Sequence, residues 1–135
     1  MDSNLRDVKQ YIGRTITNIR IEVDDEGRKE DSLLIEFEPD EEEPVPEPGL
    51  LRLYDGGQQC CEYRHMHTDD LLEYFIQTIF LGVEVKEGPE EDGADGYQEC
   101  AFLVVRTSLG EFTVANYNEH NGYYGGFWLV AQALA

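Results

Sequence analysis

Short segments in which apolar and polar residues alternate recur along this chain, and they predict a protein built mainly from β-strands. Successive side chains of a strand point to opposite faces, so alternation is typical of a strand with one buried face. The expected strands are residues 15–23, 32–37, 50–54, 60–66, 79–85, 100–107, 112–117 and 123–130. Acidic stretches that contain proline or glycine, residues 39–48 and 87–98, are expected to be loops.

Two segments show helical spacing instead. In residues 3–11, Ser3 is a plausible cap for a short helix, and apolar residues follow at helical intervals: Leu5, Val8 and Ile12. Further along, Thr68 is a second expected cap, and it precedes an apolar stripe formed by Leu71, Leu72, Phe75 and Ile76. Each predicted helix therefore precedes a run of predicted strands.

The two halves of the chain resemble each other in this plan. Residues 11–16 align with residues 75–80, and residues 33–37 align with residues 102–106. Most of the difference between the halves is loop length. The alternative interpretation is that any two β-meanders look alike at this level.

The expected fold class is therefore α+β, a mainly antiparallel β-sheet built from two related helix-plus-meander halves, residues 3–66 and 68–131. Each half has only a small apolar core, so the halves are expected to bury their apolar faces against each other. We therefore expect residues 1–135 to form a single domain with an internal duplication.

The charge of the chain is unusual for its size. Twenty-nine acidic residues stand against ten basic ones, which gives a formal net charge of −19. Such a surface repels nucleic acid and anionic membranes, so neither is expected as a direct partner, and it attracts basic proteins. Solubility or adaptation to high salt explains the same charge equally well, so a basic protein partner is one of two interpretations.

The cysteines and the first residues bear on location. Cys60, Cys61 and Cys100 are an odd number, and adjacent cysteines rarely bridge each other, so a disulfide framework is not expected. Residues 1–10 are polar and do not resemble a signal peptide, and no apolar run has the roughly 18 residues of a membrane span. These features predict a cytoplasmic protein.

Three short motifs carry a resemblance to a known family. They are Ile12-Gly13-x-Thr15, the pair Cys60-Cys61 after a glycine-rich turn, and the stretch Asn121-Gly122-Tyr123-Tyr124-Gly125-Gly126. Roughly from residue 8 to residue 130, the chain resembles a family of small bacterial and phage proteins of unknown function. Gln77 stands where the second half would repeat Gly13, so the first motif is not repeated. The resemblance implies a lineage and a phage or mobile-element origin, and it supplies no activity or catalytic residue.

Residues 60–67 contain most of the side chains that could carry chemistry. On an extended strand one face is shared by Cys61, Tyr63, His65 and His67. A His-x-His pair and a cysteine could hold zinc together with His120 or Glu119 from the matching loop of the other half. Adjacent cysteines lack zinc-finger spacing, however, and free cysteine is commonly buried. We therefore predict no metal and no cofactor, with Cys60 or Cys61 filling the core.

The sequence contains no familiar catalytic motif. Cys61 and His65 could pair as nucleophile and base, but nothing orients them. A nucleophile elbow, a Walker loop and a dinucleotide-binding fingerprint are absent from the sequence. Gly56-Gly57 and Gly125-Gly126 each precede a predicted strand rather than a helix, so they are interpreted as turns or bulges. The chain is not expected to be an enzyme, and no catalytic residue is predicted.

Tyrosines beside glycines form a second candidate binding surface. Tyr117 and the rings of residues 123–128 surround glycines that permit close approach to flat, amphipathic side chains. The alternative is that alternate rings face the core while the others cover an edge. The predicted binding residues, taken over both candidate surfaces, are Tyr117, His120, Tyr123, Tyr124, Cys61, Tyr63, His65 and His67.

Two functions from different classes follow. The first is a non-catalytic acidic interaction protein, phage-encoded, that engages a basic host protein by imitating nucleic acid. The second is a small-molecule or metal-binding module that uses the Cys/His strand and the aromatic glycine-rich loop. The net charge favours the first function, and the clustering of Cys, His and Tyr favours the second.

Overall fold

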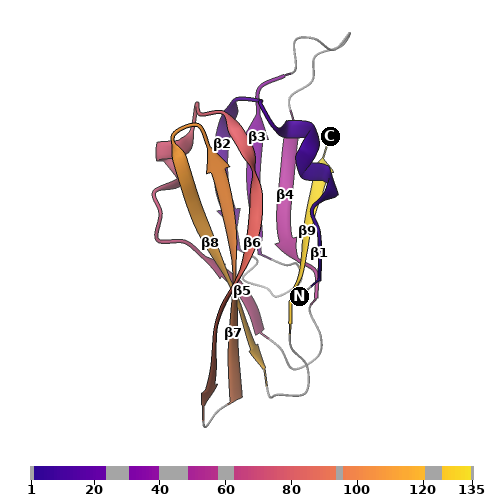
Figure 1. Cartoon of the computed structure of the whole chain (residues 1–135), viewed down its shortest axis with the longest axis vertical. Coiled ribbons are helices and arrows are strands. Elements are labelled where there is room, and N and C mark those ends of the chain that lie inside the picture. Colours follow the sequence, from indigo (N-terminus) through magenta and orange to yellow (C-terminus); the bar gives the residue numbers. More distant parts are fainter. Residues whose placement is uncertain are drawn as a thin grey trace.

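The computed structural model describes residues 2–23, 31–39, 49–57, 63–93, 96–120 and 126–134. In these residues the chain forms nine β-strands and two 3₁₀ turns (Figure 1). The strands are β1 (Asp2–Asn4), β2 (Ile16–Glu22), β3 (Ser32–Phe37), β4 (Gly49–Asp55), β5 (Tyr63–His67), β6 (Phe80–Gly93), β7 (Gly96–Thr107), β8 (Gly110–His120) and β9 (Trp128–Leu134). The turns are η1 (Arg6–Tyr11), between β1 and β2, and η2 (Leu72–Phe75), between β5 and β6.

The α+β class expected from the sequence is wrong, because neither predicted helix forms. Residues 3–11 contribute to β1 and to the six-residue turn η1, and the second segment forms only the four-residue turn η2. No side chain caps either turn, and helices this short are unstable because nucleation costs more than a few hydrogen bonds return. The hydroxyl of Thr68, an expected cap, donates a hydrogen bond to the carbonyl of Thr113 at 2.7 Å. The described chain is a mainly-β protein.

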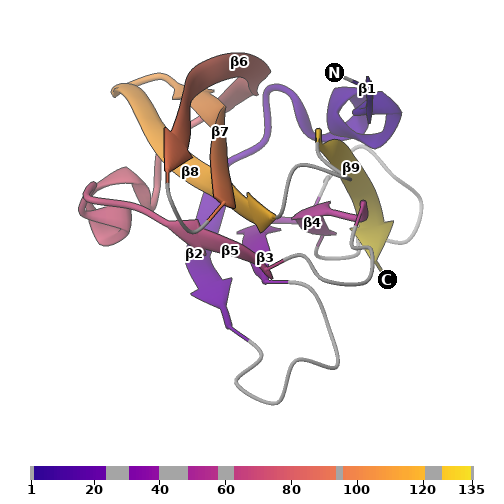
Figure 2. The same cartoon turned by 90° about the horizontal axis from the view of Figure 1, so that it is seen from below.

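The strands form two sheets. Sheet 1 has the strand order β1-β9-β4-β3-β2, and sheet 2 has the order β5-β8-β7-β6. Figure 2 shows β6, β7 and β8 on one side of the molecule and β4 and β9 on the other. Both sheets contribute to one apolar core, whose largest fully buried side chains are Phe37, Phe80, Phe112, Ile16, Leu33, Ile35, Leu51, Leu53, Leu103 and Leu129.

The fourth strand of each half joins the other sheet. β2-β3-β4 and β6-β7-β8 are antiparallel meanders of consecutive strands. The strand after β4 is β5, which pairs with β8 in sheet 2, whereas β9, the strand after β8, pairs with β4 in sheet 1. The exchange covers one open edge of each meander with a strand from the other half. The expectation that residues 3–66 and 68–131 are helix-plus-meander halves is also wrong, because a 3₁₀ turn replaces each helix and the last strand of each half lies in the other sheet.

The two meanders meet at a short backbone junction. An isolated antiparallel bridge joins Thr15 to Ile79. Two backbone hydrogen bonds flank it: Ile16 N–H to Thr78 O at 2.8 Å, and Phe80 N–H to Arg14 O at 2.9 Å. Buried backbone groups need such partners, because an unpaired buried amide costs about as much as a lost hydrogen bond. The junction therefore fixes the first residues of β2 against those of β6.

Gly13 and Gln77 hold similar backbone conformations on the two sides of this junction. Their φ angles are 92° and 70°, in the left-handed region that glycine adopts without strain. The N–H of Gly13 donates to Phe80 O at 2.8 Å, and the N–H of Gln77 donates to Ile16 O at 2.7 Å. Each side of the junction thus holds a left-handed residue, although only the first side has a glycine for it.

The segment 87–98, expected to be a loop, is instead the distal part of a long hairpin. β6 continues to Gly93 and β7 begins at Gly96, so the hairpin extends beyond the ends of neighbouring strands (Figure 1). The register shifts between Glu87 and Glu90, and Pro89 lies within this bulge. A proline lacks an N–H, and an edge strand with a bulge tolerates that loss.

None of the helical elements in the described ranges is long and apolar enough to cross a membrane.

Candidate functional site

The register of sheet 2 aligns a row of side chains on its outer face, away from the core. His65 of β5 lies opposite Tyr117 of β8, and Tyr117 lies opposite Cys100 of β7. Directly paired residues project to the same face of a sheet. Their chain neighbours Met66 and Ala101 belong to the core cluster on the inner face. We call His65, Tyr117 and Cys100 the central rung.

Three rings stack along this outer face. The ring centroids of Tyr63 and His65 are 4.8 Å apart with 27° between the ring planes, and those of His65 and Tyr117 are 5.0 Å apart at 23°. Such pairs contribute about 0.5–1.5 kcal/mol beyond the burial of their area. Tyr63 still keeps 61% of its surface exposed. The stack therefore holds three aromatic rings in fixed positions on the outside of sheet 2.

An open cleft of about 580 Å³ lies along the central rung. We call it the aromatic cleft. All four strands of sheet 2 line it, through His65, Met66, His67, Pro89, Gln98, Cys100, Phe102 and Tyr117. Its lining combines rings and apolar groups with a few polar atoms, which is the usual composition of a binding pocket. A cleft of this kind can hold a flat group by stacking and orient it by hydrogen bonds.

The chemistry of the aromatic cleft suits binding better than nucleophilic attack. Burial raises the pKa of the Cys100 thiol, so this sulfur stays protonated and poorly reactive near pH 7. The imidazole of His67 faces Asp69, with 2.8 Å between Nε2 and Oδ1. The Nδ1 atom of His65 is buried and has no hydrogen-bond partner within the described part of the chain. The cleft thus offers a neutral thiol and ring faces rather than a thiolate beside a base.

A second rung, which carries an acidic residue, lies next to the central rung. Tyr63 of β5 pairs with Glu119 of β8, and Glu119 pairs with Gln98 of β7. These positions share the outer face with Tyr117, since each lies two residues from a member of the central rung along its strand. Glu119 is exposed. We call Tyr63, Glu119 and Gln98 the acidic rung.

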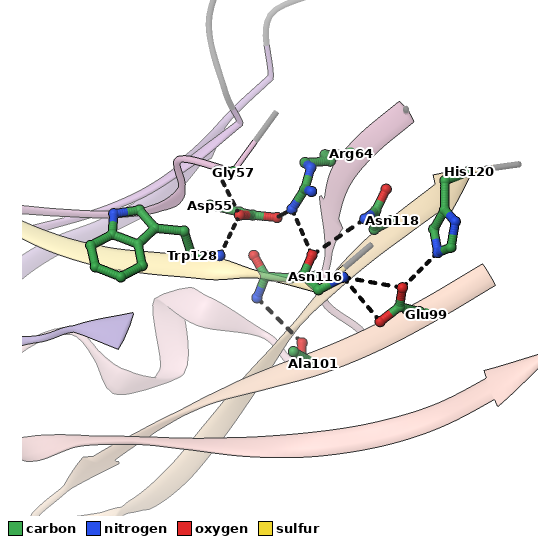
Figure 3. Close-up of polar contacts among 10 residues, drawn as sticks. Asp55, Gly57, Arg64, Glu99, Ala101, Asn116, Asn118, His120 and Trp128 are labelled. Carbon is green, nitrogen blue, oxygen red and sulfur yellow. Dashed lines mark hydrogen bonds and ion pairs between the residues drawn. The ribbon is translucent and has the colours of Figure 1, made fainter. Parts of the chain in front are cut away.

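On the inner face of the same strands the apolar core gives way to a buried ion pair. Arg64 of β5 and Asp55 of β4 are 2.6 Å apart, and their side chains are only 6% and 7% exposed (Figure 3). The second oxygen of Asp55 accepts the backbone N–H groups of Gly57 and Trp128, both at 3.0 Å. A buried charge needs partners of this kind, because desolvation without them costs several kcal/mol. The ion pair therefore joins sheet 1 to sheet 2.

A second acidic group continues this network. The Nε2 atom of His120 lies 2.5 Å from Glu99 Oε1, and the His120 side chain is 5% exposed. Glu99 also accepts the backbone N–H of Gly126, at 3.1 and 3.2 Å to its two oxygens. The carbonyl of Gly126 accepts hydrogen bonds from Arg64 at 2.9 Å and from Asn118 at 3.3 Å (Figure 3). We call Asp55, Arg64, Glu99, Asn118 and His120 the polar cluster.

The polar cluster fixes where strands begin and end. Its members lie on β4, β5, β7 and β8, and its backbone partners Gly57 and Gly126 flank β4 and β9. Asn116 is 1% exposed and donates to the carbonyls of Ala101 and Val114 at 3.4 and 3.3 Å. The hydrogen bonds named above join these side chains to one another and to backbone groups. The polar cluster therefore positions the strands behind the aromatic cleft and does not open into that cleft.

Comparison with known proteins gives a family without an assigned activity. A family model described as a domain of unknown function (DUF7448) matches residues 9–130. The chain belongs to this family. No curated protein and no solved structure matches the chain. The matched range contains the aromatic cleft, the acidic rung and the polar cluster, so DUF7448 membership brings no function to any of them.

The structure divides the predicted binding residues into three groups. Tyr63, His65, His67 and Tyr117 lie together on the outer face of sheet 2. Strand alternation in the sequence groups the first three, whereas Tyr117 belongs to the other candidate surface predicted from the sequence. His120 does not join them, since it projects to the inner face and contacts Glu99. The remaining predicted residues, Cys61, Tyr123 and Tyr124, lie outside the described residues, as does Cys60.

The zinc set considered from the sequence is not assembled in the described residues. His120 and Glu119 are adjacent in β8 and therefore project to opposite faces. Within the segments that the structure describes, no three His, Cys, Asp or Glu side chains lie close enough together to hold a metal ion. Strand geometry turns His120 away from His65 and His67, whereas Glu119 shares their face, and Cys61 lies outside the described residues.

Sequence reasoning missed the residues of the polar cluster other than His120. A signal was present in β8, where the inward positions continue with a period of two but change from apolar to polar. They run Phe112, Val114, Asn116, Asn118 and His120. A buried face that turns polar needs polar partners on the facing sheet. That requirement could have pointed to Asp55, which ends the alternating strand β4 at a buried position.

Proposed function

We propose that this DUF7448 protein is a non-catalytic binding protein that engages a basic protein through the aromatic cleft. The observation that carries the proposal is the stack of Tyr63, His65 and Tyr117 on the outer face of sheet 2. Exposed, preordered aromatic rings beside a cleft are typical of the anchors that dominate binding energy at interfaces. Function therefore resides in a surface rather than in a catalytic group.

The charge of the chain supports a basic partner. With a net charge of −19, the protein attracts cations over a distance of about 8 Å at physiological ionic strength and accelerates their association. Glu119 adds an exposed carboxylate beside the rings. A host protein that binds nucleic acid carries a matching positive surface, and an acidic phage protein would compete for that surface by imitating the phosphate backbone.

A capture experiment across a salt series tests this proposal. The immobilised protein should retain a basic protein from a bacterial lysate at low salt and release it as salt rises, because screening weakens the attraction. The Tyr117→Ala variant should lose the same protein at low salt although its net charge is unchanged. Retention that depends on salt but not on Tyr117 would contradict a role for the cleft. Thermal stability that rises with salt, with no partner retained, would instead support salt adaptation.

A second candidate is a small-molecule or metal-binding module, and one observation favours it. His65 and His67 line the same cleft, whose volume suits a small planar ligand. Elemental analysis of the purified protein and thermal melting with planar compounds separate this function from the first. Stoichiometric zinc that is lost in the His65→Ala/His67→Ala variant would favour the metal-binding module over the protein partner.

A further inference from the structure

The geometry points to the guanidinium group of an arginine side chain as the group that the aromatic cleft recognises. This inference rests on the proposed function and names the chemistry of its partner. One face of the Tyr117 ring stacks on His65, and the anchoring surface is the part of this ring that lines the aromatic cleft. The pairing carboxylate is Glu119 in the acidic rung. The partner is therefore a basic protein segment in which arginine, rather than lysine, makes the contact.

The spacing of the two rungs supports a planar cation. Tyr117 and Glu119 are two residues apart on β8, so their Cα atoms are separated by about 7 Å along the strand. Both side chains project to the outer face, on which Tyr117 is only partly buried and Glu119 is exposed. A guanidinium lying flat on a ring keeps its N–H groups at its rim, where a neighbouring carboxylate can accept them. The two rungs supply a ring face and an acceptor side by side.

This chain already uses the same contact internally on sheet 1. The Cζ atom of Arg52 lies 3.8 Å from the ring centroid of Tyr54, and its Nε donates to Ser32 Oγ at 2.8 Å. The cation–π contacts in the described segments all use arginine, and none involves the rings of Tyr63 or Tyr117. Within the described ranges, the rings of Tyr63 and Tyr117 thus have no arginine over them.

Charged residues near the two ends of the aromatic cleft determine where along it a cation is expected to bind. At the far side of the central rung from Glu119, Lys86 lies opposite Phe102 and is exposed. An ammonium group there repels a second cation, whereas the acidic rung attracts one. The guanidinium is therefore expected over Tyr117 on its Glu119 side rather than over Phe102. Lysine fits this position less well, because its compact ammonium cannot stack and pair in a plane at once.

Three short peptides test the inference directly. They share a neutral Gly/Ser backbone and carry two arginines, two lysines, or two citrullines, which keep the planar shape of arginine without its charge. Affinity for the protein is measured by titration, and backbone amide shifts in NMR spectra report the site. The arginine peptide should bind at least about fivefold more tightly than either of the others, with the largest shifts at residues of β8 and β7.

Variants locate the contact. Tyr117→Ala should weaken binding of the arginine peptide at least fivefold, whereas Tyr117→Phe keeps the ring and should change it less than twofold. Glu119→Gln should weaken binding about threefold or more. The matched control is Glu111→Gln, which removes the same charge from the same face of β8 but lies beside Arg106, far along the strand. Glu111→Gln should leave arginine-peptide binding within twofold of the unchanged protein.

The outcomes distinguish the inference from the proposed function. Equal binding of the arginine and lysine peptides, or equal losses in Glu119→Gln and Glu111→Gln, overturns guanidinium recognition and leaves a basic partner possible through net charge. Equal binding of the arginine and citrulline peptides also overturns it, since shape alone would then decide. If none of the three peptides binds and no basic protein is retained from a lysate, the proposed function fails together with the inference.

Discussion

The outer faces of the two sheets differ in how they satisfy their own side chains. On sheet 1, Arg20 lies 3.3 Å from Glu22 and 3.4 Å from Glu36, and Arg52 covers the ring of Tyr54. On sheet 2, the rings of the central rung stack on one another, and a cleft lies along them. Similar strand orders therefore carry two kinds of surface. On sheet 1 these arginines cover their neighbours, whereas sheet 2, although Arg106 pairs there with Glu84 and Glu111, keeps the cleft beside its central rung accessible.

The difference shows that strand topology alone does not place a binding surface. Each sheet contains a three-stranded meander completed by a strand from the other half. What distinguishes them is which residue types the register brings side by side on the outward positions. On sheet 1, an arginine covers a tyrosine ring and pairs with glutamates. Beside the cleft of sheet 2, tyrosine lies next to histidine and glutamate, and a cation from a partner can bind there.

The largest effect should come from breaking the ion pair that holds the two sheets together. Asp55→Ala leaves Arg64 buried without its carboxylate and should reduce the free energy of unfolding by about 3–5 kcal/mol. Urea denaturation measures this loss. The matched control is Glu22→Ala, which breaks the exposed pair with Arg20 on sheet 1 and should cost less than about 1 kcal/mol. Comparable losses in the two variants would contradict a special role for the buried pair.

The next effect concerns binding and contrasts one tyrosine from each outer face. Tyr117→Ala should weaken binding of a basic partner at least fivefold, because it removes the ring that forms the cleft wall. Tyr54→Ala removes a ring that Arg52 already covers, so it should leave binding unchanged. Titration of both variants with the same partner measures the contrast. Equal losses would mean that the two faces are not functionally different.

A pH titration probes Cys100, at the β7 end of the central rung. The pKa of Cys100 is raised by burial, so the folded protein keeps this thiol neutral while the unfolded chain ionises it above about pH 8.5. Its contribution to stability is therefore complete below that pH and declines as pH rises further, by at most about 1.4 kcal/mol per pH unit. Denaturation from pH 7 to 10 should show a steeper loss in the parent than in Cys100→Ala. Parallel curves would contradict a raised pKa.

The smallest effect should come from sheet 1. Arg52→Lys keeps the charge but loses the planar stack on Tyr54 and the Nε hydrogen bond to Ser32. The free energy of unfolding should fall by about 0.5–1 kcal/mol, with no change in partner binding. Thermal melting and titration measure the two quantities. A change in partner binding would show that the face of sheet 1 also contributes to recognition.

Alternation predicted the strands well where one face is buried. The segment 32–37 coincides with β3, and residues 15–23 and 50–54 differ from β2 and β4 by a residue or so at each end. The failures have physical causes. Helical spacing in residues 3–11 predicted an α-helix, but so short a segment forms a 3₁₀ turn without a capping side chain. The proline and glycines of residues 87–98 predicted a loop. This failed because β6 accommodates Pro89 in a bulge, and a bulge leaves no signature in the sequence.

The pairing register of the strands could not be predicted from the sequence. The alignment of residues 33–37 with 102–106 gives Ile35 and Val104 equivalent positions. In the structure Ile35 pairs with Leu51 in the core, whereas Val104 pairs with Glu84 and Thr113 on the outer face. A shift of one residue exchanges the two faces of a strand, and apolar β-branched residues occur on both faces here. Sequence similarity between strands could not decide which face was buried.

The candidate site was predictable only where it lies on a single strand. Alternation places Tyr63, His65 and His67 on one face, and the structure agrees. The pairing of Arg64 with Asp55 depends on how one sheet packs on the other, and no local spacing encodes that distance. The same holds for His120, whose partner Glu99 lies on a neighbouring strand. Contacts between strands distant in sequence need the topology first.

The exchange of β5 and β9 between the sheets determines when each sheet edge can be paired during synthesis. The β2-β3-β4 meander leaves the ribosome early, but the strand that completes its edge at β4 is β9, which is made after all the other strands. Until then β4 presents unpaired backbone groups, an edge that other chains can extend. Pairing β4 with β9 also closes a long loop, which slows folding. During that interval the high net charge favours separation of neighbouring chains, because like charges repel.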